Sequence, residues 1–159
     1  ERRPLVFDSG RHSAVRLWDA VKGEPLADLS DDYQKMYLSA AAWSPGSERV
    51  VLGRGEEAEG SIWMLDAAEN CQQLQKLSPV HQYGVTDFLF HPDGKHLFSA
   101  GRDTVVRIWD LESGKMIRQL GEPRGGQFKD WIHSIALNDD ATLLAAADMA
   151  GQVNVWNLG

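Results

Sequence analysis

The sequence predicts an all-β fold, a partial β-propeller of four-stranded antiparallel blades that is open at both ends. The strand-like segment Val106–Asp110 recurs along the chain, and its copies align on Trp18, Leu65, Trp109 and Trp156 at steps of 47, 44 and 47 residues. A period in the mid-forties, with an aromatic residue near the end of an alternating strand, is typical of propeller blades. A second register supports this period, because the first apolar residues of successive strands lie 12 residues apart in three pairs: Leu38 and Val50, Val85 and Leu97, and Ile132 and Leu144.

Turn signals between the apolar segments predict the strands of each blade. Pro, Gly, Asn or Asp residues at 44–47, 91–94 and 138–141 mark hairpins that join the innermost strand to the second one. Turns at 22–24, 69–70 and 112–114 join the third strand to the outermost one. The innermost strands contain small apolar residues, which suits strands whose two faces are both packed.

The chain therefore holds about three and a half blades with no linker between them. Residues 1–29 form a blade that lacks its innermost strand, 30–77 and 78–120 form complete blades, and 121–159 form a blade that lacks its outermost strand. Exposed strand edges invite pairing with further strands. We expect either a piece of a longer propeller or half of a ring that a second copy closes as a homodimer; the start at Glu1 without a methionine favours the piece.

Composition argues against several classes of partner and site. The 159 residues carry a net charge of −7 with scattered basic residues, so neither nucleic acid nor an anionic membrane is an expected partner. The single cysteine, Cys71, excludes an internal disulfide and a cysteine-rich zinc site. It favours a reducing compartment such as the cytoplasm, although a secreted propeller without disulfides stays open. No apolar run has the length of a membrane span.

The stretch Val85–Leu120 resembles the repeat of the WD-repeat β-propeller family almost position by position. The resemblance implies a buried structural tetrad in this blade, made of His81, Ser99, Asp103 and Trp109. The other blades depart from it: the aspartate position holds His12, Glu59 and Ala150, and the histidine position holds Gln34 and Phe128. We therefore expect the blade of Val85–Leu120 to be the stiffest part of the chain.

His81, Ser99 and Asp103 also include the residue types of a serine-hydrolase triad. No Gly-x-Ser-x-Gly segment surrounds Ser99, so we interpret the group as structural and expect no enzyme and no cofactor. The five histidines form no His-x-His or His-x-x-x-His pair, so no metal site is expected. The acidic run 55–60 is interpreted as a solvated turn, and the Arg-Gly-Gly triplet within 121–126 as a connector.

Variable loop lengths point to one binding face. The connections between the second and third strands, and between blades, vary in length and lie together on one side of a propeller, where repeat proteins often bind. Phe128 and Trp131 can instead tether a long loop by local packing, and Trp63 either packs between blades or forms an exposed contact. The candidate partner-binding residues are Tyr33, Glu56, Glu57, Tyr83, Arg102, Arg124, Phe128 and Trp131.

The resemblance to WD-repeat propellers implies a non-catalytic scaffold that presents its loops to a protein or peptide partner. The alternative is a regulatory or sensor propeller attached to an enzyme in a longer chain. A propeller hydrolase would need a polar catalytic cluster, and the sequence offers none outside the tetrad.

Overall fold

The computed structural model describes residues 5–9, 15–29, 37–55, 60–67, 71–124 and 127–159, and the regular secondary structure in these ranges is β-strand apart from one short 3-10 helix. No helix in them is long and apolar enough to cross a membrane. The elements are β1 (Leu5–Ser9), β2 (Val15–Asp19), β3 (Glu24–Asp28), β4 (Leu38–Trp43), β5 (Arg49–Arg54), β6 (Gly60–Asp66), β7 (Gln72–His81), β8 (Val85–Phe90), β9 (His96–Gly101), β10 (Val106–Asp110), β11 (Lys115–Leu120), the short 3-10 helix η1 (Phe128–Asp130), β12 (Ile132–Leu137), β13 (Leu143–Asp148) and β14 (Val153–Asn157).

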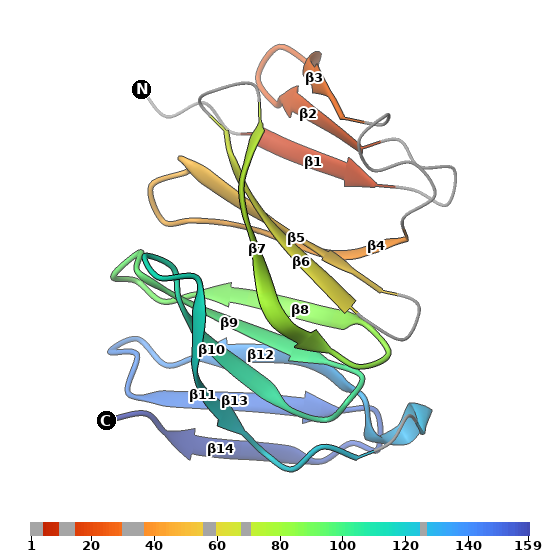
Figure 1. Ribbon diagram of the computed structural model, residues 1–159, viewed down its shortest axis with the longest axis vertical. Helices are drawn as coiled ribbons and strands as arrows, with labels where there is room; N and C mark the ends of the chain where they lie inside the picture. Colours follow the sequence, from red (N-terminus) through yellow and green to blue (C-terminus); the bar gives the residue numbers. More distant parts are fainter. Residues whose placement is uncertain (1–4, 10–14, 30–36, 56–59, 68–70, 125–126) are drawn as a thin grey trace.

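The strands form successive antiparallel meanders that are stacked along the molecule (Figure 1). β1–β3 and β12–β14 are three-stranded sheets, while β4–β7 and β8–β11 each contain four strands in sequence order. One parallel pair, Lys115 with Ser78, joins the outermost strands β11 and β7, so that the two central meanders share a sheet edge. This arrangement confirms the predicted all-β partial propeller.

The innermost strands lie side by side, and β8 contacts both β4 and β12. The hairpin that follows each of them reverses at a residue with positive φ: Ser47 (60°), Gly94 (68°) and Ala141 (56°). Each hairpin also has a register shift near the start of its innermost strand. Short turns with left-handed residues are therefore what returns each innermost strand to the next strand.

Apolar clusters between successive sheets make up the core. Leu17 and Leu29 of the first meander pack with Val50, Leu52, Trp63, Leu65 and Cys71 of the second. Val51, Ile62, Met64 and Leu77 pack with Phe88, Phe90, Leu97 and Trp109 of the third. Phe98, Ala100, Val106, Ile108 and Leu120 of the third pack with Ile132, Ile135, Leu144 and Ala146 of the fourth. Each sheet is thus stabilised chiefly by the sheet beside it.

Trp63 packs between the first two sheets, which decides between the two interpretations of this residue. Only 6% of its surface is exposed, and the Lys76 ammonium lies 5.8 Å from the centre of its ring. The tryptophan therefore fills space between blades and is not an exposed contact.

We predict that Trp63→Ala lowers the free energy of unfolding by about 3–5 kcal/mol, because it removes a large buried side chain and leaves a cavity. Urea unfolding followed by circular dichroism measures the change. Val21→Ala, at a residue that is 75% exposed, is the control and should change stability by less than about 0.5 kcal/mol. A loss below about 1 kcal/mol for Trp63→Ala would contradict the packing role.

Candidate functional site

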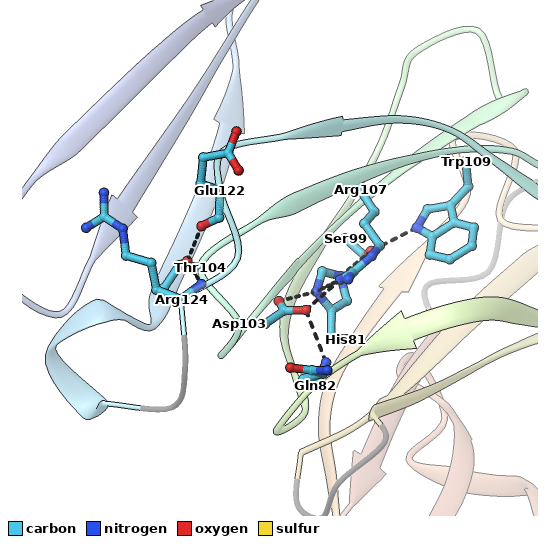
Figure 2. A network of polar contacts seen from close by, with 9 residues as sticks. All are labelled: His81, Gln82, Ser99, Asp103, Thr104, Arg107, Trp109, Glu122 and Arg124. Atoms are coloured by element: carbon cyan, nitrogen blue, oxygen red, sulfur yellow. Dashed lines mark hydrogen bonds and ion pairs between the residues drawn. The ribbon is translucent and has the colours of Figure 1, made fainter.

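Ser99, Asp103 and Trp109 of the third meander (β8–β11, called the third sheet below) and His81 of the second form one buried hydrogen-bonded chain (Figure 2). The indole N–H of Trp109, on β10, donates to Ser99 Oγ on β9 at 2.8 Å. Ser99 Oγ lies 2.7 Å from His81 Nε2, and His81 Nδ1 lies 2.8 Å from Asp103 Oδ1 in the turn after β9. His81 is the last residue of β7 and pairs in register with Gly60 of β6. The chain therefore links the outermost strand of the second meander to the interior of the third.

The positions of the protons follow from the donors. Trp109 can only donate and ionised Asp103 can only accept, so each contact has one donor and one acceptor when His81 is neutral. In that arrangement Ser99 donates to Nε2, and Nδ1–H donates to Asp103. Burial lowers the pKa of His81 below its ordinary value, and this effect outweighs the opposing influence of Asp103. The neutral imidazole is thus the form that the folded protein holds.

Arg107 completes the network, and sequence reasoning did not single it out. Its guanidinium donates to Asp103 Oδ2 at 2.8 Å and also contacts His81 Nδ1. The backbone N–H of Gln82 donates to the same oxygen at 3.1 Å. Burial would raise the pKa of Asp103, but the hydrogen bond from His81 and the charge of Arg107 bring it below its ordinary value. An arginine four residues after Asp103, between the apolar residues Val106 and Ile108, was the available signal.

The network has the residue types of a triad but not the access that a triad needs. His81 and Ser99 have no exposed surface, and Asp103 is only 1% exposed. Ser99 Oγ already accepts from Trp109. Gly101 packs so closely against the His81 ring that a methyl group there would overlap it. The four side chains therefore contact one another, and the Ser99 hydroxyl has no exposed surface.

The equivalent positions of the neighbouring sheets contain other residues. In the β5–β6 register, Leu52 and Leu65 stand where the third sheet has Ser99 and Trp109, and both leucines are buried. In the fourth sheet Ala146 takes the serine position, and Phe128 takes the histidine position on η1. Among the described residues, the complete network occurs only around Trp109.

Several candidate binding residues gather at one end of the sheets, around the start of β8 and β12. The Arg102 guanidinium lies 4.2 Å from the centre of the Trp131 ring. Phe128 meets that ring edge to face at 5.0 Å. Phe128 is 59% exposed and Tyr83 is 42% exposed. We call Tyr83, Arg102, Phe128 and Trp131 the loop face. The pair fits both interpretations given above, local packing and partner contact. Trp131 is packed against Arg102 and Phe128, while Phe128 remains exposed.

A hollow of about 340 Å³ opens beside Arg102 and Trp131. Three polar atoms among its lining side chains are buried without a hydrogen-bond partner: Thr86 Oγ1, Arg102 Nε and Trp131 Nε1. Two of these atoms, Arg102 Nε and Trp131 Nε1, can only donate hydrogen bonds. Its lining residues are Ser39, Val85, Thr86, Arg102, Trp131, Ile132, His133 and Met149.

Arg124 lies near this region but makes its contacts through the backbone. Its N–H donates to the Asp103 carbonyl at 3.2 Å and to Thr104 Oγ1 at 3.0 Å, and Thr104 in turn donates to the Glu122 carbonyl (Figure 2). The exposed Arg124 side chain is therefore carried by the turn that holds Asp103. Tyr33, Glu56 and Glu57, together with His12, Gln34 and Glu59, lie outside the described residues.

Comparison with known proteins gives a consistent result. The family model described as "WD domain, G-beta repeat" matches residues 71–110 and 118–157. The chain is 33% identical over 157 residues to the target of rapamycin complex subunit LST8 of Mus musculus, covering 98% of this chain and 45% of that protein. It is 29% identical over 161 residues to the protein transport protein SEC31 of Saccharomyces cerevisiae, covering 96% of this chain and 12% of that protein. It is 26% identical over 148 residues to a kinesin-like protein of Mus musculus, covering 92% of this chain and 8% of that protein. The chain thus spans less than half the length of each of these relatives.

We predict that stability falls as the pH drops below about 6.5, the ordinary pKa of histidine in an unfolded chain. The pKa of His81 is lowered in the folded protein, so below pH 6.5 the unfolded chain binds a proton that the folded chain does not. The stabilisation is complete above pH 6.5 and is lost toward the folded pKa. Urea unfolding between pH 7.5 and 5.5 measures this slope.

His81→Asn should be less stable at pH 7.5 and should show a flatter slope over the same range. His133→Gln replaces an exposed histidine and should keep the wild-type slope. Equal slopes for His81→Asn and the wild type would show that the buried imidazole does not control this pH dependence.

Proposed function

The chain belongs to the WD-repeat family, and from this membership we propose that it is a scaffold whose loop face binds a protein or peptide partner without turnover. The observation that carries the proposal is that Arg102 and Trp131 pack together beside one hollow, with the exposed Phe128 ring against Trp131. Tyrosine, tryptophan and arginine are the residues most often responsible for binding energy at protein interfaces. The name of one relative, a subunit of the target of rapamycin complex, is in keeping with a role in assemblies.

The loop face is held in place by its own backbone, which favours recognition by a preformed surface. The Arg102 N–H donates to the Gly84 carbonyl at 3.0 Å, and the Met149 N–H donates to the Trp131 carbonyl at 2.9 Å. Asp103, next to Arg102, is fixed by the buried network. A surface that is already ordered loses little conformational entropy when a partner binds.

Burial of the Ser99 hydroxyl supports a role without catalysis. A nucleophile must reach the reacting atom of its substrate, and Ser99 has no exposed surface. Its oxygen is also shared between Trp109 and His81. We therefore assign the network to stability and the loop face to binding.

A second candidate is a regulatory or sensor propeller within a longer, catalytic protein. The match to a kinesin-like protein favours it, because the aligned region covers only 8% of that relative. In both candidates the same face would contact the partner, which is either a separate protein or another part of the same polypeptide.

We also propose that further blades, or a second copy of this chain, cover the outer face of β12–β14. Val153 is 64% exposed, Val155 is 60% exposed and Leu143 is 40% exposed, and the three lie on neighbouring strands of this sheet. β14 pairs only with β13 among the described strands. An apolar sheet face beside an unpaired edge favours association with another sheet.

To test the binding face, we predict that Tyr83→Ala combined with Phe128→Ala reduces partner capture at least tenfold. Both side chains are exposed, so the variant should fold like the wild type. The measurement is quantitative mass spectrometry of proteins that cross-link to the chain in cell extract. The control, Val21→Ala with Leu74→Ala, removes two exposed apolar residues elsewhere.

Partners retained by the wild type and the control but lost by the loop-face variant would support the proposal. Equal loss in both variants, or in neither, would contradict it. Labelling of Ser99 by a fluorophosphonate probe in the folded chain would overturn its non-catalytic part.

To test association, we predict that the isolated chain does not remain monomeric at about 10 µM, because its apolar sheet face is open. Size exclusion coupled to light scattering measures the mass. A stable dimer supports ring closure by a second copy, and polydisperse aggregates support cover by further blades. Val153→Lys with Val155→Lys should shift the chain toward monomer, whereas Val21→Lys should not. A monodisperse, folded wild-type monomer would contradict the proposal.

A further inference from the structure

The hairpin turn between β8 and β9 brings together two imidazoles and a carboxylate. His91 and His96 face each other across the turn, and the backbone N–H of His91 donates to the backbone carbonyl of His96 at 2.9 Å. Asp93 Oδ2 lies 3.0 Å from His91 Nδ1 and 2.7 Å from His96 Nδ1. One possible ligand atom from each residue lies within 4.8 Å of the others. The turn is at the opposite end of the sheets from the loop face (Figure 1), so the cluster is independent of the proposed partner site.

The backbone of the turn fixes the carboxylate in this position. Asp93 Oδ1 accepts the N–H groups of Lys95 at 2.7 Å and of His96 at 3.1 Å. Gly94, with φ of 68°, allows the sharp reversal, and its N–H donates to the His91 carbonyl at 3.0 Å. Because Oδ1 is held by the backbone, Oδ2 is left to face the two imidazoles. The three atoms are therefore placed before any ligand arrives.

The hydrogen bonds within the cluster are not mutually consistent. His91 Nδ1 lies 3.2 Å from the Asp93 N–H, which requires a lone pair on that nitrogen. The same nitrogen lies 3.0 Å from the Asp93 carboxylate, a contact that is favourable only with a proton or a shared cation between the two atoms. A cation bound by the two imidazole nitrogens and Oδ2 would give all three atoms a common partner.

We propose that His91, Asp93 and His96 form a binding site for a zinc-type divalent transition-metal ion. Two imidazoles and one carboxylate suit Zn²⁺, Ni²⁺ or Cu²⁺, whereas Ca²⁺ and Mg²⁺ prefer ligand sets made of oxygen atoms. Bonds of about 2.0–2.1 Å in a tetrahedral site place ligand atoms about 3.3 Å apart. The observed separations of 2.7 and 3.0 Å between Oδ2 and the two nitrogens are shorter than this, so both rings would move outward when a metal binds.

The surroundings favour a cation and leave it accessible. The three side chains are between 27 and 33% exposed, so solvent or a further ligand can complete the coordination. Asp110 lies opposite His96 in the β9–β10 register and interacts with it electrostatically, which adds a second negative charge nearby. The His91 ring also packs beside Phe98, at 6.2 Å between ring centres. The spacing of His91 and His96 matches neither His-x-His nor His-x-x-x-His, and a hairpin is what brings residues five positions apart together.

The test is a calorimetric titration of the tag-free, chelator-stripped chain with zinc sulfate at pH 7.5. We expect one Zn²⁺ per chain and no heat of binding with calcium or magnesium chloride. His91→Gln and His96→Gln should each lower the association constant at least tenfold, and His133→Gln should leave it unchanged. Asp93→Asn can keep the backbone hydrogen bonds of Oδ1 but loses the charge, so it should also bind at least tenfold more weakly while folding normally by circular dichroism.

Nitrogen-15 spectra of the imidazoles supply a second readout, in which zinc should shift the Nδ1 signals of His91 and His96 and not those of His133. Absence of binding at about 100 µM zinc would overturn the proposal. Wild-type affinity in the His96→Gln and Asp93→Asn variants, or an equal loss in His133→Gln, would overturn it as well.

Discussion

The hydrogen-bonded chain from Trp109 through Ser99 and His81 to Asp103 is the constraint around which the third sheet is arranged. Every member is buried, and a buried polar group that loses its partner costs roughly 1–3 kcal/mol. The network is therefore stable when complete and unfavourable when incomplete. The neighbouring sheets lack several members of the network together. The second sheet has Leu52 and Leu65 at the serine and tryptophan positions. The fourth has Ala146 and Ala150 at the serine and aspartate positions.

Loss of the network in one sheet has a consequence for the surface of the molecule. Phe128 occupies the position in the fourth sheet that the buried His81 occupies in the third. No serine or aspartate at the equivalent positions can bind its side chain, and Phe128 is 59% exposed. The intact network contributes to the same surface from the other side, because Asp103 fixes the turn that carries Arg102 and whose backbone accepts the Arg124 N–H. The loop face thus contains Phe128, which is exposed because the fourth sheet lacks the network, and Arg102, whose turn is fixed by the network of the third sheet.

Periodicity predicted the strands and the hairpins, because these features repeat at fixed intervals along the sequence, and the resemblance to the WD-repeat family implied the members of the tetrad. Periodicity did not identify Arg107. The contacts of this residue with Asp103 and His81 depend on which face of β10 its side chain lies on, and the repeat period does not give this. Nor did it decide between the alternatives for Trp63, because packing between sheets joins residues whose separation in sequence carries no signal. The grouping of His91, Asp93 and His96 was likewise missed, since it depends on the shape of a turn.

The repeat also indicates what kind of surface should cover β12–β14. Val106 and Ile108 of β10 precede Val153 and Val155 of β14 by one repeat, and they are 0 and 7% exposed where β14's residues are 64 and 60% exposed. The first pair is buried because Ile132, Ile135 and Leu144 of the next sheet pack into the same cluster. The second pair has the same chemistry and the same place in its strand. A cover of the same kind, the apolar face of another such sheet, is therefore the surface that complements it, whether it comes from further blades or from a second copy.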